Sequence, residues 1–149
     1  MDYADTYVVD LAERLDAPRF CALVLGAAPR WLERLLAARD VVAGRLGFAT
    51  QERNYGGPVE LEVGRKFGPL LVRSVSPQRV VCGDADRHLI MRATFTTDET
   101  GPCGRLTTEV QFRDAVGRWY FAAIKPFHRR IIPVLLSAPF PSRARAVPS

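Results

Sequence analysis

Two histidines are the side chains of this sequence best suited to acid–base chemistry, because imidazole exchanges its proton nearest to neutral pH. His128 lies three residues after Lys125 and directly before Arg129. On a helix these three side chains occupy neighbouring turns, and the two cations would disfavour a protonated imidazole, which suits a neutral base or acceptor. A solvated basic face or an anion contact explains the same pattern, and we favour that interpretation over catalysis.

The second histidine, His88, shares a predicted strand face with Arg92 and Thr94. It would point outward if the opposite face lines a cavity, or it could pair with Asp86, so a structural role is favoured. We see no glycine-rich phosphate loop, metal-spaced cluster or nucleophile elbow, and we predict no metal and no cofactor. The catalytic residues stay unknown, and the candidate polar site comprises His88, Arg92, Lys125, His128 and Arg129.

The element that must position His128 is a long helix within Gly117–Leu136. At 100° per residue one broad face is apolar, and Arg118, Lys125 and Arg129 lie opposite. We expect the apolar face to cover a sheet and the basic face to point outward. Asp114 is a candidate N-cap, and Pro126 and Pro133 should bend or break the helix. The expected inner face comprises Tyr120, Ala123, Ile124, Phe127, Ile131, Val134 and Leu135.

The chain before this helix is mostly β in pattern, with two earlier helices that begin at Pro18 and Pro29. Alternation of apolar and polar residues predicts antiparallel strands. In one strand Leu89, Met91, Ala93 and Phe95 face the same way, and the next strand repeats this with Leu106, Thr108, Val110 and Phe112. The expected strands are Thr6–Leu11, Val59–Val63, Leu70–Val75, Val80–Cys82, Arg87–Thr97 and 106–113. The layout is α+β, with helices on one face of a curved sheet.

The segments Asp84–Leu89 and Gly117–Pro133, together with Ala28–Val41 and Gly64–Val75, resemble a bacterial family known as domain of unknown function 2867. Ile90 stands where that family often carries an acidic residue. The resemblance implies a helix-grip fold, similar to START domains and polyketide cyclases (the SRPBCC group), in which a curved antiparallel sheet wraps around a long, proline-bent C-terminal helix. It also implies apolar ligands and allows association with a nucleotide-binding reductase domain.

Length and composition indicate one domain over residues 1–137, followed by a disordered tail over residues 138–149 that is rich in proline and arginine. The net charge of +5 is the difference between 21 basic and 16 acidic residues. The basic residues are scattered along the chain, so we expect no nucleic-acid binding. Three separated cysteines argue against a disulfide framework. Without a signal peptide or a membrane-length apolar run, we expect no membrane association and a cytoplasmic protein.

The leading functional hypothesis is a protein that binds a small apolar molecule in a cavity between the sheet and the final helix. An enzyme of the cyclase or dehydratase type, using Tyr120 or a histidine in that cavity, is the first alternative. A ligand-free interaction module, such as a homodimer, is the second. The candidate cavity-lining residues are Leu89, Met91, Phe95, Val110, Phe112, Trp119, Tyr120, Ala123 and Phe127.

Overall fold

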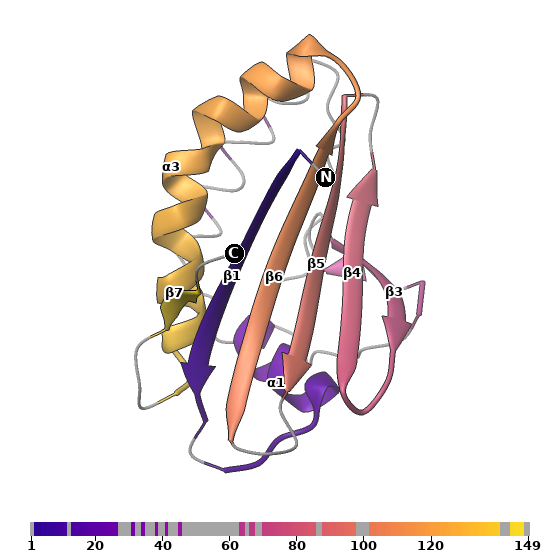
Figure 1. The fold of residues 1–149 in the computed structure, drawn as a ribbon. Coiled ribbons are helices and arrows are strands. Elements are labelled where there is room, and N and C mark those ends of the chain that lie inside the picture. Colours follow the sequence, from indigo (N-terminus) through magenta and orange to yellow (C-terminus); the bar gives the residue numbers. More distant parts are fainter. Residues whose placement is uncertain are drawn as a thin grey trace.

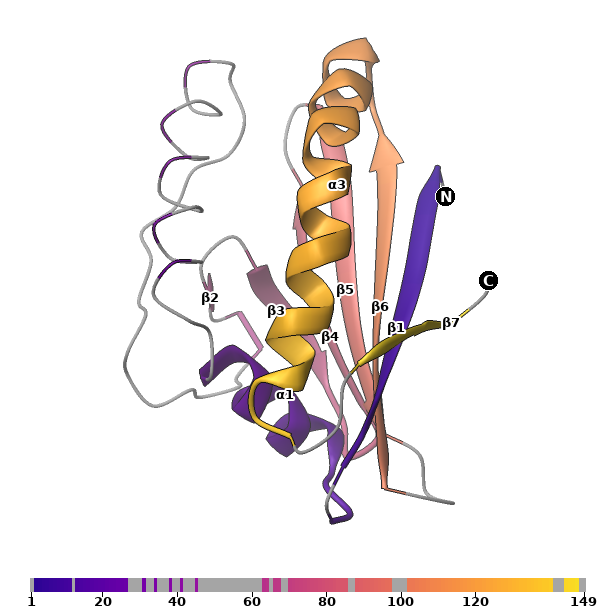
Figure 2. The ribbon, with the colours of Figure 1, turned by 90° about the vertical axis from the view of Figure 1, so that its left-hand side faces the viewer.

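The protein has an α+β fold in which a curved antiparallel sheet carries helices on one face (Figures 1 and 2). The structure, a computed structural model, describes residues 2–11, 13–26, 63–64, 66–67, 70–85, 88–97, 102–140 and 144–147, and the single positions 31, 34, 38, 41 and 45. The expected strand over residues 59–63 and most of the helix expected from Pro29 lie outside the described residues.

The sheet has the strand order β2-β3-β4-β5-β6-β1-β7, and each neighbouring pair is antiparallel. The N-terminal strand therefore inserts between two strands from the C-terminal half, as Figure 1 shows. The bounds are β1 Tyr3–Asp10, β2 Lys66–Phe67, β3 Leu70–Val75, β4 Arg79–Ala85, β5 Leu89–Thr97, β6 Cys103–Phe112 and β7 Arg145–Val147.

Side-chain alternation on the central strands is as the sequence predicts. Met91 pairs with Val110 and Phe95 pairs with Leu106, so the two apolar rows lie side by side on the helix-bearing face. Phe95 and Leu106 belong to the main core, with Val9 of β1 and Val80 of β4. The opposite face is more polar, and there exposed Arg92 is paired in register with Glu109.

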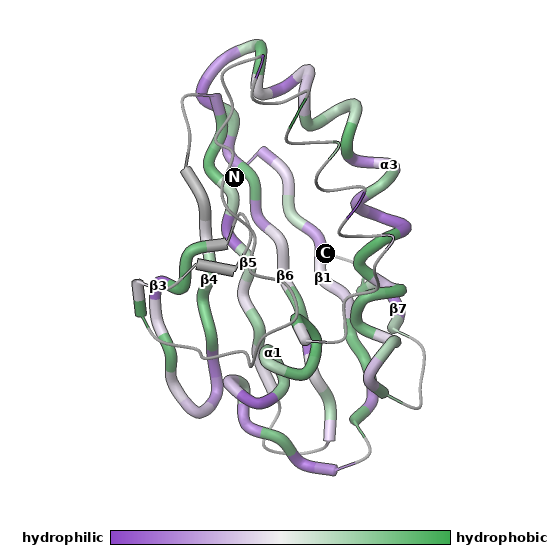
Figure 3. The backbone as a smooth tube through the Cα atoms, turned by 180° about the vertical axis from the view of Figure 1, so that it is seen from behind, coloured by the Kyte–Doolittle hydropathy of each residue, from purple (hydrophilic) through white to green (hydrophobic). Residues whose placement is uncertain are grey.

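The first helix, α1 (Ala17–Gly26), closes the lower end of the helix-bearing face. The Asp16 carboxylate caps it by accepting the Arg19 amide at 2.9 Å. The ring of Phe20 lies directly over Gly104, where a Cβ atom would be 2.6 Å from the ring. Figure 3 shows α1 in front of the lower central strands, with α3 along the side of β1 and β6.

The long helix, α3 (Ala115–Ser137), is continuous through Pro126 and Pro133, and Figure 1 shows it as curved rather than broken. Asp114 is its N-cap, as predicted, and accepts the Gly117 amide at 2.9 Å. Near its other end, Leu136 is buried in the main core. Both ends of α3 are therefore fixed against the rest of the fold.

The predicted orientation of α3 is wrong in part. The buried positions are Gly117, Phe121 and Leu136, whereas Trp119 is 79% exposed and Phe127 is 56% exposed. The reason lies at the first turn, where Gly117 packs against the backbone carbonyl of His88. Since a side chain at this position would collide with that carbonyl, the close approach requires glycine and sets the rotation of the helix.

The C-terminal segment also differs from the prediction. Residues 145–147, placed by the sequence in a disordered tail, form β7 and pair with Thr6, Tyr7 and Val8 of β1. These residues are exposed. β7 pairs only with the middle of β1. The first three residues of β1, Tyr3, Ala4 and Asp5, therefore pair with β6 along one edge but have no β7 residue opposite them along the other edge.

Candidate functional site

A cluster of polar side chains lies where α3 crosses β1. Asp5 is at its centre, and its Oδ2 atom accepts hydrogen bonds from the Tyr3 hydroxyl at 2.6 Å and from Nε2 of His128 at 3.0 Å. The side chains of Asp5 and His128 are 15% and 13% exposed. His128 therefore points toward the sheet, and the expectation that it belongs to a basic outer face is wrong.

Strand and helix periodicity explain how these residues meet. Tyr3 and Asp5 alternate along β1 and both face the helix. On α3, His128 follows the buried Phe121 by seven residues, which is two helical turns. The Tyr3 ring lies 4.8 Å from the ring of Phe121 and 6.4 Å from that of His128. Apolar ring packing therefore holds the polar atoms in place.

Opposing effects act on the Asp5 carboxyl. Burial is the largest influence and would raise its pKa, but the hydrogen bonds from His128 and Tyr3 outweigh burial and hold the pKa below its ordinary value. Burial and the neighbouring Asp5 raise the pKa of Tyr3. Asp5 is thus a partly buried carboxylate, and its buried Oδ1 atom has no hydrogen-bond partner among the described residues.

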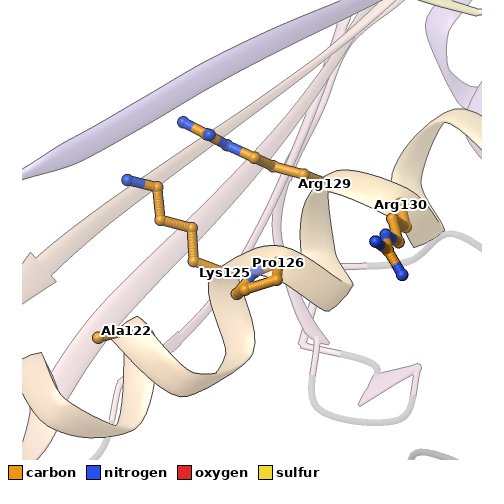
Figure 4. Close-up of a pocket in the computed structure, with 5 residues that line it drawn as sticks. All are labelled: Ala122, Lys125, Pro126, Arg129 and Arg130. Carbon is orange, nitrogen blue, oxygen red and sulfur yellow. The ribbon is translucent and has the colours of Figure 1, made fainter.

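Basic side chains extend the cluster onto the flank of α3. The Lys125 ammonium lies 5.2 Å from the centre of the Tyr3 ring. The neighbouring Tyr3 is also the main influence that raises the pKa of the Arg129 guanidinium. Lys125 and Arg129 line a surface pocket of about 490 Å³ with Ala122, Pro126 and Arg130. Figure 4 shows Lys125 and Arg129 extending side by side toward β1, while Arg130 projects in another direction.

His88 forms a second histidine–aspartate pair, away from this cluster. Its Nδ1 atom lies 2.7 Å from Oδ2 of Asp114, the N-cap of α3. The hydrogen bond from the Gly117 amide, followed by that from His88, lowers the pKa of Asp114. His88 is buried, and its carbonyl accepts the Arg113 amide at 2.8 Å. This pair joins the beginning of β5 to the beginning of α3, which is a structural role. Asp86, the alternative partner considered from the sequence, lies outside the described residues.

Most of the predicted cavity-lining residues lie on the helix-bearing face. Leu89 and Val110 are buried, Met91 and Phe112 are half-buried, and Phe95 packs against Phe20 in the main core. Leu89, Met91 and Tyr120 form a small apolar cluster apart from that core. On α3, Trp119, Ala123 and Phe127 are exposed. Whether these residues line a ligand site stays a prediction.

A family model described as "Protein of unknown function (DUF2867)" matches residues 1–135. The chain belongs to this family. The DUF2867 match runs from β1 through nearly all of α3, so it includes both partners of the Asp5–His128 pair and leaves β7 outside. No curated protein and no solved structure matches the chain.

The candidate polar site predicted from the sequence of this DUF2867 protein includes His128, Lys125 and Arg129. It does not include Tyr3 or Asp5. The alternation of β1 could have indicated Asp5, because it places this carboxylate between Tyr3 and Tyr7 on the apolar face of the strand. A lone carboxylate on such a face requires a partner. Among the described residues, no group of three or more His, Cys, Asp or Glu side chains could hold a metal ion. Across the same residues, no helix is both long and apolar enough to cross a membrane.

Proposed function

We propose that the protein is a helix-grip protein that binds a small, mostly apolar molecule between α3 and the central strands β5 and β6. A helix-grip protein needs a curved antiparallel sheet beside a long helix, and this chain has both (Figure 2). Binding of an apolar molecule needs apolar side chains on the sheet, and the apolar rows of β5 and β6 that face this helix support it. A ligand of this kind would cover apolar surface that the chain itself leaves accessible.

The observation that carries the proposal is the incomplete burial of one strip of α3. Tyr120, Ile124 and Phe127 lie on the same flank by helical spacing. Tyr120 packs with Leu89 and Met91 of β5, yet Phe127 is 56% exposed and Met91 is only half-buried. A ligand that excludes water from the Phe127 ring and from the half-buried Met91 would be stabilised by the apolar surface it covers.

An uncharged fluorescent apolar probe, Nile red, tests the proposal. We expect saturable binding to the wild-type protein, with an increase in melting temperature at saturating probe. Phe127→Arg should weaken binding at least tenfold, because it puts a charge at the proposed site. Trp119→Arg is the matched control, since Trp119 is a larger exposed apolar side chain of the same helix.

Equal loss of binding in the two variants would refute a discrete site and indicate a general apolar surface on α3. Sedimentation velocity then distinguishes the interaction-module alternative. A concentration-dependent dimer that either substitution dissociates would identify this surface as a contact between protein chains. A monomer at all concentrations with saturable probe binding is the result that the ligand-binding proposal expects.

The Asp5–His128 pair favours one second candidate, an acid–base enzyme of the cyclase or dehydratase type. The pair provides a partly buried imidazole with a carboxylate that orients it, which is the arrangement that general acid–base catalysis uses. Incubation with a cell extract, followed by mass spectrometry, tests this candidate. A metabolite consumed by the wild type but not by His128→Phe, with Nile red binding retained, would support it. Equal turnover by both proteins would eliminate His128 as the catalytic group.

A further inference from the structure

We propose that the surface pocket on α3 lined by Ala122, Lys125, Pro126, Arg129 and Arg130 is an anion site that binds the phosphate group of a small molecule. It lies on the opposite flank of the helix from Tyr120 and Phe127, so this site is separate from the apolar one. Three basic side chains line a pocket of about 490 Å³, and none of its lining residues is acidic. A phosphate ester, with nearly two negative charges at neutral pH, matches this charge better than a carboxylate does.

The positive charge of the pocket is offset only in part by the part of the chain that the structure describes, where the Asp5 carboxylate acts on Arg129 without forming an ion pair with it. Lys125, Arg129 and Arg130 form no ion pair with a described carboxylate. The neighbouring acid, Asp5, directs Oδ2 to Tyr3 and His128 instead. Lys125 and Arg129 are one helical turn apart, so their positive charges repel each other and destabilise the helix. A bound anion would reduce this repulsion.

Tyr3 holds two of the cations in position. The Lys125 ammonium lies over its ring at 5.2 Å, and Arg129 lies close enough for Tyr3 to be the main influence that raises the pKa of its guanidinium. Figure 4 shows the two side chains parallel and extended in the same direction. Cations oriented before binding lose less side-chain entropy when the anion arrives, and arginine offers paired N–H donors that match phosphate oxygens.

Pro126 leaves a backbone carbonyl oxygen of the pocket, that of Ala122, without its helical hydrogen bond. Proline has no amide hydrogen, so the carbonyl of Ala122, four residues earlier, lacks its usual helical donor. That oxygen can accept a hydrogen bond from a ligand. Two parallel cations, Lys125 and Arg129, and one acceptor suit a phosphate group attached to a hydroxyl-bearing molecule more closely than a bare inorganic anion.

Calorimetric titration with inorganic phosphate and with glycerol 3-phosphate tests the site at constant ionic strength. We expect saturable binding of both, tighter for the ester. Arg129→Gln and Lys125→Gln should each weaken binding about tenfold or more, the loss of one charge-assisted hydrogen bond. Arg118→Gln is the control, because it removes the same charge from an exposed position seven residues before Lys125, roughly 10 Å along the helix.

A twofold or smaller effect of Arg118→Gln, beside the larger effects at Lys125 and Arg129, supports a defined site. Equal effects of all three variants, or no saturable binding, would overturn it. Phosphatidylcholine vesicles with and without phosphatidic acid distinguish the source of the phosphate. Binding to the acidic vesicles without binding of soluble phosphate would overturn the small-molecule form of the proposal. Nile red binding is a separate readout, so either proposal can fail without the other.

Discussion

Replacing His128 by phenylalanine tests whether the Asp5–His128 bond stabilises the contact between α3 and β1. Phenylalanine keeps a ring beside Tyr3 and Phe121, which lie 6.4 Å and 6.5 Å from the imidazole, but it removes the donor to Asp5. A hydrogen bond to a charged group contributes about 1.5–3 kcal/mol. The carboxylate would keep Tyr3 as its partner, so we expect the free energy of unfolding to fall by about 2 kcal/mol.

The matched measurement is a double-mutant cycle with Asp5→Leu, followed by urea unfolding and circular dichroism at pH 7. Asp5→Leu alone leaves the buried Nε2–H of His128 without its acceptor, whereas the double variant removes both polar partners. The double variant should therefore be at least about 1 kcal/mol more stable than the sum of the single effects predicts. Additive effects would refute the energetic coupling that we infer.

The same cycle has a pH signature. Because the folded-state pKa of Asp5 is below its ordinary value of 3.8, the ionised carboxylate stabilises the folded protein fully above about pH 5. This contribution is lost as the pH falls below 3.8 toward the lower folded-state pKa. The stability difference between the wild type and Asp5→Leu should shrink over that acidic window, and a constant difference from pH 7 to pH 3 would contradict the assignment.

Three further predictions concern single positions. Gly117→Ala should cost more than about 2 kcal/mol in urea unfolding, despite a gain near 1 kcal/mol in helix propensity, because the methyl group meets a backbone carbonyl. Trp119→Arg should change stability by less than about 0.5 kcal/mol, since the side chain is exposed. In thiol labelling at pH 8, Cys103 should react in the folded protein and Cys21 and Cys82 only after unfolding. Cys21 and Cys82 are both fully buried, and the neighbouring Cys82 thiol together with burial raises the pKa of Cys21.

Local sequence patterns predicted the elements of this fold better than their contacts. The alternation in β5 and β6, the helix that begins next to Pro18 and the Asp114 cap each depend on residues close in sequence, and all are observed. The pairing of β1 with β6 joins residues about one hundred positions apart. No local pattern specifies such a pairing, so the inner position of Asp5 opposite α3 was not predicted.

The rotation of α3 shows why helical periodicity alone was insufficient. The helix carries two apolar strips, one with Phe121, Ile132 and Leu136 and another that includes exposed Phe127 and Val134. Either strip could face a sheet by periodicity, and the second contains more large residues. The choice depends on Gly117, whose lack of a side chain permits contact with the backbone of His88. Steric fit at one turn therefore decides which strip is buried.

Both histidines of the chain attach α3 to the sheet through an aspartate. His88 and Asp114 join the first turn of the helix to β5, and His128 and Asp5 join its middle to β1. Between these attachments the helix presents apolar side chains on one flank and cations on the other. A ligand on either flank would therefore meet a helix that is already fixed, so binding requires little reorganisation of α3. His128 is therefore a positioning residue for the proposed phosphate site, because it shares Asp5 with Tyr3, over whose ring Lys125 lies. His128→Phe should accordingly weaken phosphate binding while Nile red binding is retained, and unchanged phosphate binding would show that the Gly117 contact alone holds the helix.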